Sequence, residues 1–254
     1  VSNLDFSGSY TKTERRNPLI ESDAVEKYYA GVGYNFAPQP KYIEPFKKLI
    51  KYRSPWWNII KDFNFNFRPS LLSFRADINR QFGAARAREV QIQGVAPSPF
   101  KIPETYDKYF VFDRVYNMRW DLTRSLNVDF SATNNARIDE PFGRIDNQEK
   151  KDSVRKNFLR GGRNTIYKQT ANASYSFPLQ KIPALDWTTA RFNYATTYNW
   201  IGASRLAISL GNTVENSQQR VFTGQLDFMR LYSKSKFLRA LETPTNKNAP
   251  PHLA

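Results

Sequence analysis

The chain has no cysteine and only one histidine among its 254 residues. Without cysteine there is no disulfide framework and no thiolate chemistry. The histidine, His252, lies in a proline-rich tail, so zinc sites and histidine-assisted nucleophiles are excluded as well. Long hydrophobic runs are also missing, because none approaches the ~20 residues of a membrane-spanning helix. This excludes a helical membrane protein but leaves a membrane β-barrel open, since the strands of such a barrel average out as polar.

Carboxylates arranged for acid–base catalysis are missing too. Such a pair requires two carboxyl groups that converge in a dry pocket. The aspartates of the predicted strands instead alternate with Arg, Asn or Thr, a pattern typical of cross-strand ion pairs on a wet surface. The sequence therefore predicts neither enzymatic activity nor a cofactor or metal. The residues concerned are Asp77, Asp121, Asp129 and Asp227, with Arg75, Arg119 and Arg191 beside them.

Acidic residues are outnumbered, since 38 Lys and Arg against 23 Asp and Glu give a net charge of +15. Such a balance often indicates nucleic-acid binding. Here the basic residues are scattered over strands and loops, and no recognition helix, zinc finger or RNP motif accompanies them. Anionic lipid headgroups or a polyanionic cell surface would match the charge equally well. We predict no nucleic-acid partner.

Residues 116–136 carry the clearest pattern in the chain. In each half, apolar and polar residues alternate, which predicts two strands that each have one apolar and one polar face. Only a tight turn around Arg124 and Ser125 fits between them, so the pair is predicted to be an antiparallel hairpin. The apolar positions are Tyr116, Met118, Trp120 and Leu122, followed by Val128, Phe130 and Ala132.

The same alternation recurs along the chain and predicts about eight strands. The links after the second, fourth and sixth strands include two short ones, whereas those after the third, fifth and seventh are long. Strands of ~10 residues, with turns on one side and loops on the other, are typical of outer-membrane barrels. The predicted fold class is all-β, an antiparallel up-and-down transmembrane β-barrel wall with long loops on one side. The predicted strands lie at 4–11, 28–36, 72–79, 116–123, 127–133, 167–177, 189–200 and 222–228.

The alternation also assigns side chains to the two faces of this wall. We expect polar side chains to face the lumen and apolar ones to face lipid or to form interfacial girdles. The predicted lumen-facing residues are Arg75, Asp77, Arg119, Asp121, Asp129, Asn172, Arg191 and Asp227. The predicted lipid-facing or girdle residues are Phe74, Trp120, Phe130, Tyr175, Trp187, Phe192 and Trp200.

Residues 41–62 are the one stretch with helical character. A basic amphipathic segment with tryptophan at one end suits a membrane interface, and an ordinary surface helix packed on a sheet explains the pattern equally well. Because short turns face the periplasm in outer-membrane barrels, we expect this basic aromatic connector at the periplasmic rim, where a plug subunit would dock. Its predicted rim residues are Lys47, Lys48, Lys51, Trp56 and Trp57.

The remaining links are predicted to be loops. Residues 83–109 are polar and punctuated by proline, and residues 137–163 carry a charge run that is typical of a solvated loop. The tail at 243–254 is predicted to be flexible.

Four segments of the chain are similar to one known family. They read KYIEPFKKLIKYRSPWWNIIKDFNFNFRPSLLSFRADINRQFG, WDLTRSLNVDFSATNNARIDEP, SYSFPLQKIPALDWTTARFNYATTYNW and NTVENSQQRVFTGQLDFMRLYSKSKFLRAL. Within them, KYIEPF and ATNNARIDEP are specific rather than compositional. On these residues the chain resembles the SprA/Sov family, which forms the outer-membrane translocon of the type IX secretion system in Bacteroidota.

The resemblance implies that residues 1–254 form a single internal segment of a much larger barrel in the bacterial outer membrane. It implies a translocon, linked to gliding motility, that passes folded cargo proteins from the periplasm to the cell surface. The implied partners are the secreted cargo, a plug subunit, a lipoprotein-shuttle partner and outer-membrane lipid. Transport at this component is expected to be passive, because the sequence contains no nucleotide-binding motif.

Two other classes of protein stay open on the sequence alone. One is a self-contained small outer-membrane porin or adhesin, which requires a closed barrel with the first strand bonded to the eighth. The other is a soluble β-sandwich that binds carbohydrate or nucleic acid, with its apolar faces on a core. A water-soluble monomer would exclude both membrane interpretations.

Overall fold

The computed structural model describes residues 3–50, 54–89 and 101–234. Lys51, His252 and the predicted flexible tail at 243–254 lie outside the described residues. The strands are β1 (Leu4–Arg15), β2 (Ile20–Phe36), β3 (Leu71–Ala87), β4 (Thr105–Asp121), β5 (Leu126–Arg137), β6 (Arg163–Phe177), β7 (Thr188–Ile201) and β8 (Thr213–Leu226). The α-helices are α1 (Asn58–Lys61), α2 (Gln148–Leu159) and α3 (Phe228–Tyr232), and the 3-10 helices are η1 (Pro55–Trp57), η2 (Leu179–Lys181) and η3 (Ile208–Leu210).

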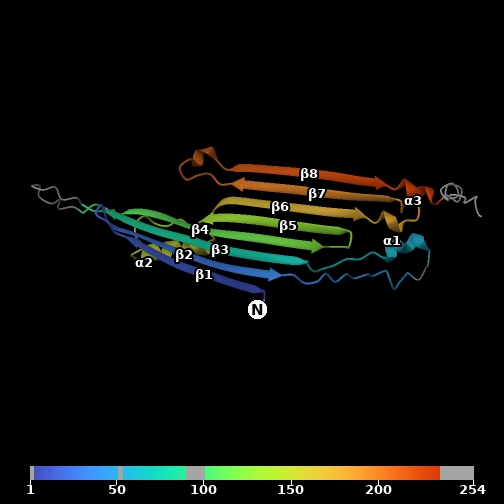
Figure 1. The fold of residues 1–254 in the computed structure, drawn as a ribbon, viewed down its shortest axis with the longest axis horizontal. Coiled ribbons are helices and arrows are strands. Elements are labelled where there is room, and N and C mark those ends of the chain that lie inside the picture. The colour runs from blue at the N-terminus through green and yellow to red at the C-terminus, as the bar shows by residue number, and fades with distance from the viewer. Residues whose placement is uncertain (1–2, 51–53, 90–100, 235–254) are drawn as a thin grey trace, which may run out of the picture.

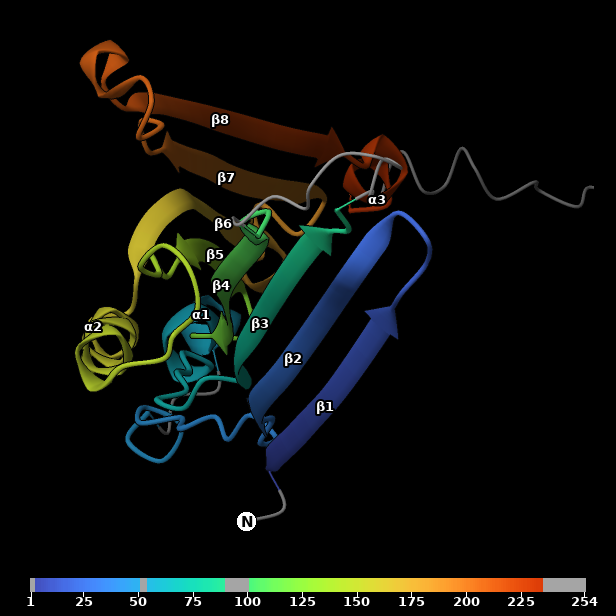
Figure 2. The same ribbon diagram turned by 90° about the vertical axis from the view of Figure 1, so that its left-hand side faces the viewer.

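One antiparallel sheet holds all eight strands in sequence order, each paired with its neighbours in the chain (Figure 1). This up-and-down order confirms the predicted all-β class. The sheet is a single curved layer whose edge strands, β1 and β8, lie far apart (Figure 2). Within the described residues β1 pairs only with β2 and β8 only with β7, so the sheet is not closed. It therefore matches neither a closed small barrel nor a sandwich of two sheets.

The predicted hairpin is confirmed by β4 and β5. Its turn is held by Thr123, whose backbone N–H donates to the carbonyl of Leu126 at 3.1 Å. The Thr123 hydroxyl oxygen also accepts from the backbone N–H groups of Ser125 at 3.1 Å and Leu126 at 2.8 Å. In the register that follows, Met118 lies opposite Phe130. The apolar positions of the two strands therefore share one face.

Several strands are longer than the sequence predicted. β2 begins at Ile20 and β8 at Thr213, and the link between β3 and β4 is shorter than the predicted loop because β3 continues to Ala87. The prediction that short turns and long loops lie at opposite ends is wrong in part. Tight turns occur at both ends, at residues 16–19 and 122–125, and the end that holds the second of these also carries the long link at 37–70.

The charge run predicted to be a solvated loop forms helix α2 instead. The Asn147 side chain caps it by accepting from the backbone N–H of Lys150 at 2.9 Å. At its other end Gly161 has φ +81°, a left-handed conformation that favours glycine after a helix. Phe158 packs against Phe110 and Phe112, with ring centroids 6.1 and 5.7 Å apart. α2 thus covers one end of the apolar face.

The connector at 41–62 is not one long amphipathic helix. Its described part forms turns, η1 and α1, and Ile43 makes an isolated antiparallel bridge with Phe65. A chain of rings from Phe46 through Phe63 and Phe65 to Phe67 packs along it, with neighbouring centroids 4.6–6.2 Å apart. None of the helices in the described segments has the length and apolar character needed to traverse a bilayer.

The sheet has little hydrophobic core. The chain exposes 19180 Å² of surface, whereas a globular protein of 29.5 kDa exposes about 11,500 Å². The buried hydrophobic residues among those described are Ala84, Phe110, Ala132, Ala136 and Ile138. The unpaired edges of β1 and β8 and most of the apolar face are therefore exposed.

Candidate functional site

The polar face of the sheet carries hydrogen-bonded ion pairs. Arg75 on β3 donates to Asp77 at 2.7 Å, and the Tyr29 hydroxyl on β2 donates to the same carboxylate at 2.6 Å. Arg75 also donates to the Tyr29 oxygen at 2.8 Å. These side chains link β2 and β3 on one face, and the charges of Arg75 and Asp77 neutralise each other. The predicted pair of Arg75 and Asp77 thus has a third member, Tyr29, which the sequence did not single out.

Gly31 leaves the space in which this cluster forms. A Cβ at position 31 would lie 2.6 Å from an Asp77 carboxylate oxygen, 2.6 Å from the Ser7 hydroxyl and 2.7 Å from the Tyr29 hydroxyl. Gly31→Ala is therefore expected to separate these groups and to lower the free energy of unfolding by about 1 kcal/mol. A urea titration of the variant measures this change. Gly8→Ala in the neighbouring strand is the matched control, because its Cβ meets only an ordinary contact at 3.6 Å; similar losses in both variants would refute the crowding argument.

A second group on the polar face surrounds Arg119. Its guanidinium lies 3.7 Å from Asp121 and 3.8 Å from Asp129, which is on the neighbouring strand. Ser70 also bonds to Asp121 at 2.5 Å. Asn172 lies opposite Asp129 in the register. Arg191 donates to Ser176 at 3.3 Å.

Asp227 is the one predicted lumen-facing residue that lies on no strand. β8 ends at Leu226, and Asp227 is the N-cap of α3, where its carboxylate accepts from the backbone N–H of Arg230 at 3.0 Å. The prediction extended the strand alternation past its end. A capping carboxylate explains this residue without a role on the polar face.

The apolar face carries the predicted aromatic residues. Phe74 and Tyr116 pack with centroids 5.1 Å apart across β3 and β4. Phe130 lies opposite Met118 and Ala171, Tyr175 lies opposite Phe192, and Phe192 lies opposite Phe222 of the edge strand. The apolar side chains at the open edges are the most accessible, with Phe6 70% exposed and Phe222 67% exposed. The register thus separates an apolar face from a polar one, and the assignment of these faces to lipid and lumen stays a prediction.

The predicted girdle tryptophans lie at or next to strand ends and make contacts within the protein. The Trp120 indole donates to the carbonyl of Asn66 at 2.9 Å, so the link between β2 and β3 contacts this end of the apolar face. Trp187 lies in the link before β7 rather than in a strand, and it donates to Ala184 at 2.8 Å. Trp200 lies near the other end of β7, beside Gly202.

The connector is tied to the β4–β5 turn by Glu44. This carboxylate pairs with Arg124 at 2.7 Å and with Lys47 at 2.5 Å, and Lys47 followed by Arg124 lowers its pKa. Lys47 therefore has an ion-pair partner within the protein and is still 61% exposed, and its place at the rim stays a prediction. Lys48 is exposed, and Trp56 and Trp57 are 61% and 43% exposed.

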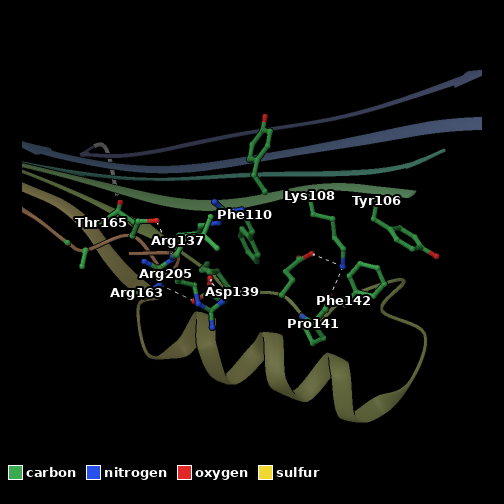
Figure 3. A pocket seen from close by; sticks show the side chains of 17 residues that line it. Tyr106, Lys108, Phe110, Arg137, Asp139, Pro141, Phe142, Arg163, Thr165 and Arg205 are labelled. Carbon is green, nitrogen blue, oxygen red and sulfur yellow. Dashed lines mark hydrogen bonds and ion pairs between the residues drawn. The ribbon is translucent and has the colours of Figure 1, made fainter. Parts of the chain in front are cut away.

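At the opposite end, a pocket of about 600 Å³ lies between the sheet and the β5–β6 link that carries α2 (Figure 3). Lys108 and Phe110 on β4 point into it. Asp139 lies 3.2 Å from Arg163 and 3.3 Å from Arg205, which comes from the β7–β8 link. The sequence did not predict this pocket, because its lining residues come from four separate segments, at 106–110, 137–142, 163–165 and 202–206.

Beside this pocket, Glu104 ties the β3–β4 link to the β5–β6 link. Arg144 donates to both of its carboxylate oxygens, at 2.9 and 3.1 Å. Arg144, followed by the hydroxyl of Tyr106, lowers the pKa of Glu104 to about 2. Arg86 lies 3.1 Å from the same carboxylate. These ion pairs hold the β3–β4 and β5–β6 links together at this end of the apolar face.

Within the described residues, no group of three His, Asp or Glu side chains is arranged to hold a metal ion. No protein-family model matches the chain, and no curated protein matches it.

Proposed function

We propose that the chain is part of the wall of a large outer-membrane β-barrel that conducts proteins, with its apolar face toward lipid and its polar face toward the lumen. The observation that carries this proposal is the open single-layer sheet with one apolar and one polar face. Such a sheet buries almost no core of its own, so its apolar face and both edges require surroundings that cover them. Lipid against the apolar face and further strands at β1 and β8 meet this requirement.

The polar face suits a surface along which proteins pass. Several of its carboxylates are paired with arginine or hydrogen-bonded by hydroxyl groups, as at Asp77 and Asp121. Such groups present hydrogen-bonding atoms but little apolar area, so a folded protein adheres weakly to them. This supports passive conduction.

The resemblance to the SprA/Sov family extends the proposal to type IX secretion and gliding motility. On this basis the cargo is secreted folded proteins, and the partners are a plug subunit and a lipoprotein-shuttle protein. The connector, at the end of the sheet with the β4–β5 turn, is the proposed periplasmic rim. Lys47, Lys48, Trp56 and Trp57 are exposed there and are available for such a contact.

Site-specific photocrosslinking in cells tests this function. A photoreactive amino acid at Asp129 or Asn172, on the polar face, is expected to crosslink to secreted proteins. The same group at Phe130 or Tyr175, on the apolar face, is expected to crosslink to lipid and not to cargo. Equal crosslinking of cargo from both faces would contradict the proposed orientation. Recovery of the chain as a water-soluble, monodisperse monomer without detergent would contradict the membrane location itself.

A further inference from the structure

Four arginines gather around one carboxylate at the α2 end of the sheet. Arg163 and Arg205 both pair with Asp139. Arg137 lines the same pocket, and together with Arg160 it lines a smaller hollow that adjoins the pocket at the end of α2. Neither of these two side chains makes a hydrogen bond or ion pair with any other residue in the described ranges. The group therefore carries three positive charges that the protein does not neutralise.

Other charges that line the pocket do not supply the missing anion. Glu140 is already paired with Arg80 at 2.5 Å and lies 3.9 Å from Lys108. Lys108 donates to the backbone carbonyls of Pro141 and Gly143, at 2.7 and 2.5 Å. An external anion with several oxygens is the complement of the arginine group. Guanidinium groups bind phosphate through pairs of parallel hydrogen bonds, so a phosphate fits them better than a single carboxylate.

The rim of the same pocket is apolar and open. Phe142 is 86% exposed and Leu206 is 99% exposed, and both line the pocket that holds the arginines. Single exposed apolar residues are normal on protein surfaces. Here, however, they border a cationic hollow, and Phe110, on the apolar face of the sheet, points into that hollow (Figure 3). A ligand that fills both the arginine-lined hollow and its apolar rim has an anionic head and a hydrocarbon chain.

We propose that this pocket binds the phosphate group of a membrane lipid, with the guanidinium groups of Arg137, Arg163 and Arg205 on the phosphate oxygens. The lipid chain then lies against Phe142, Leu206 and the adjoining apolar face. The claim that lipid adjoins this face rests on the proposed function, whereas the phosphate chemistry of the pocket does not. Bound lipid would fix the depth of this end of the wall at the level of the headgroups.

Binding of a short-chain phosphatidic acid, held below its critical micelle concentration, tests the site in the full chain. Calorimetry compares this probe with short-chain phosphatidylcholine and with inorganic phosphate. We expect the phosphatidic acid to bind at least tenfold more tightly than either. The double variant R137Q/R205Q is expected to lose at least tenfold in this affinity. Circular dichroism shows whether the variant keeps the sheet, which we expect because the Arg137 side chain has no hydrogen bond or ion pair among the described residues and Arg205 lies in an exposed link.

Two control variants test the site: the first tests for a general effect of positive charge, and the second separates binding of the lipid headgroup from binding of the lipid chain. Lys168→Gln removes one positive charge from the polar face of β6 and is expected to change the affinity less than twofold. Leu206→Ser is expected to weaken phosphatidic acid binding and to leave inorganic phosphate binding unchanged. Equal losses of affinity in Lys168→Gln and R137Q/R205Q would contradict binding at this pocket. Equal affinity for phosphatidic acid and inorganic phosphate would contradict the proposal that the ligand is a lipid. A chain that stays soluble without detergent yet binds the probe through Arg137 and Arg205 would refute the proposed function and support the site.

Discussion

Replacing Phe130 by arginine is expected to lower the free energy of unfolding of the chain, reconstituted in lipid vesicles, by about 2–4 kcal/mol. Phe130 lies near the middle of the apolar face, between Met118 on β4 and Ala171 on β6. If this face meets lipid, the guanidinium must be placed in hydrocarbon or must distort the bilayer around it. A urea titration followed by tryptophan fluorescence measures the loss.

Ser131→Arg is the matched control for this variant. Ser131 is the next residue of β5, it is exposed on the polar face, and its hydroxyl donates to Asn117 at 3.0 Å. An arginine there meets water, so a loss below about 1 kcal/mol is expected, the size of one exposed hydrogen bond. Equal losses at positions 130 and 131 would show that the two faces do not differ in their surroundings.

Alternation predicted the centre of each strand because one face is apolar there and the other polar. The same signal fails where both faces are polar. β2 begins with IESDAVEK and β8 with TVENSQQR, and in neither segment does an apolar stripe mark one side. Their strand structure comes instead from pairing with a neighbour, as β8 pairs along its whole length with β7. Such pairing is long-range information that a local pattern does not contain.

The charge run at 137–163 predicts a loop, whereas residues 148–159, half of which are charged, form helix α2. The local signals for its ends were nevertheless present in the sequence. Asn147 stands at the N-cap, and Gly161 and Gly162 follow the last turn with positive φ. What no local pattern contains is the contact of Phe158 with β4, which places the helix over the apolar face.

The two ends of the sheet differ in how much of their structure the local sequence predicts. At the connector end, the sequence predicts the tryptophans and the hairpin turn but not the contacts between them. At the α2 end, the arginines at 137, 163 and 205 lie in segments that become neighbours only after β5, β6 and β7 have paired. Their chemistry therefore emerges from topology rather than from any motif.

Asn64→Ala is expected to lower the free energy of unfolding by about 1–3 kcal/mol, because it removes a hydrogen bond between the β2–β3 link and the hairpin turn. Asn64 is 7% exposed. Its side-chain oxygen accepts the backbone N–H of Arg124 at 2.8 Å, and its amide group donates to the carbonyl of Asp62 at 2.8 Å. Alanine leaves the Arg124 N–H without this acceptor in a partly buried turn. Hydrogen exchange of that amide, measured with the unfolding free energy, reports the loss.

Asn64→Asp is the control that separates the two bonds of this side chain. Aspartate keeps an acceptor for the Arg124 N–H and loses only the donor to Asp62. We therefore expect it to protect the Arg124 amide nearly as well as asparagine, and to cost less stability than alanine. If both variants exchange this amide equally fast, the Asn64 oxygen does not hold the turn. The link between β2 and β3 would then be attached by its other contacts, which include the Glu44–Arg124 pair, the Trp120 indole and the bond from the Asn66 N–H to the carbonyl of Leu122.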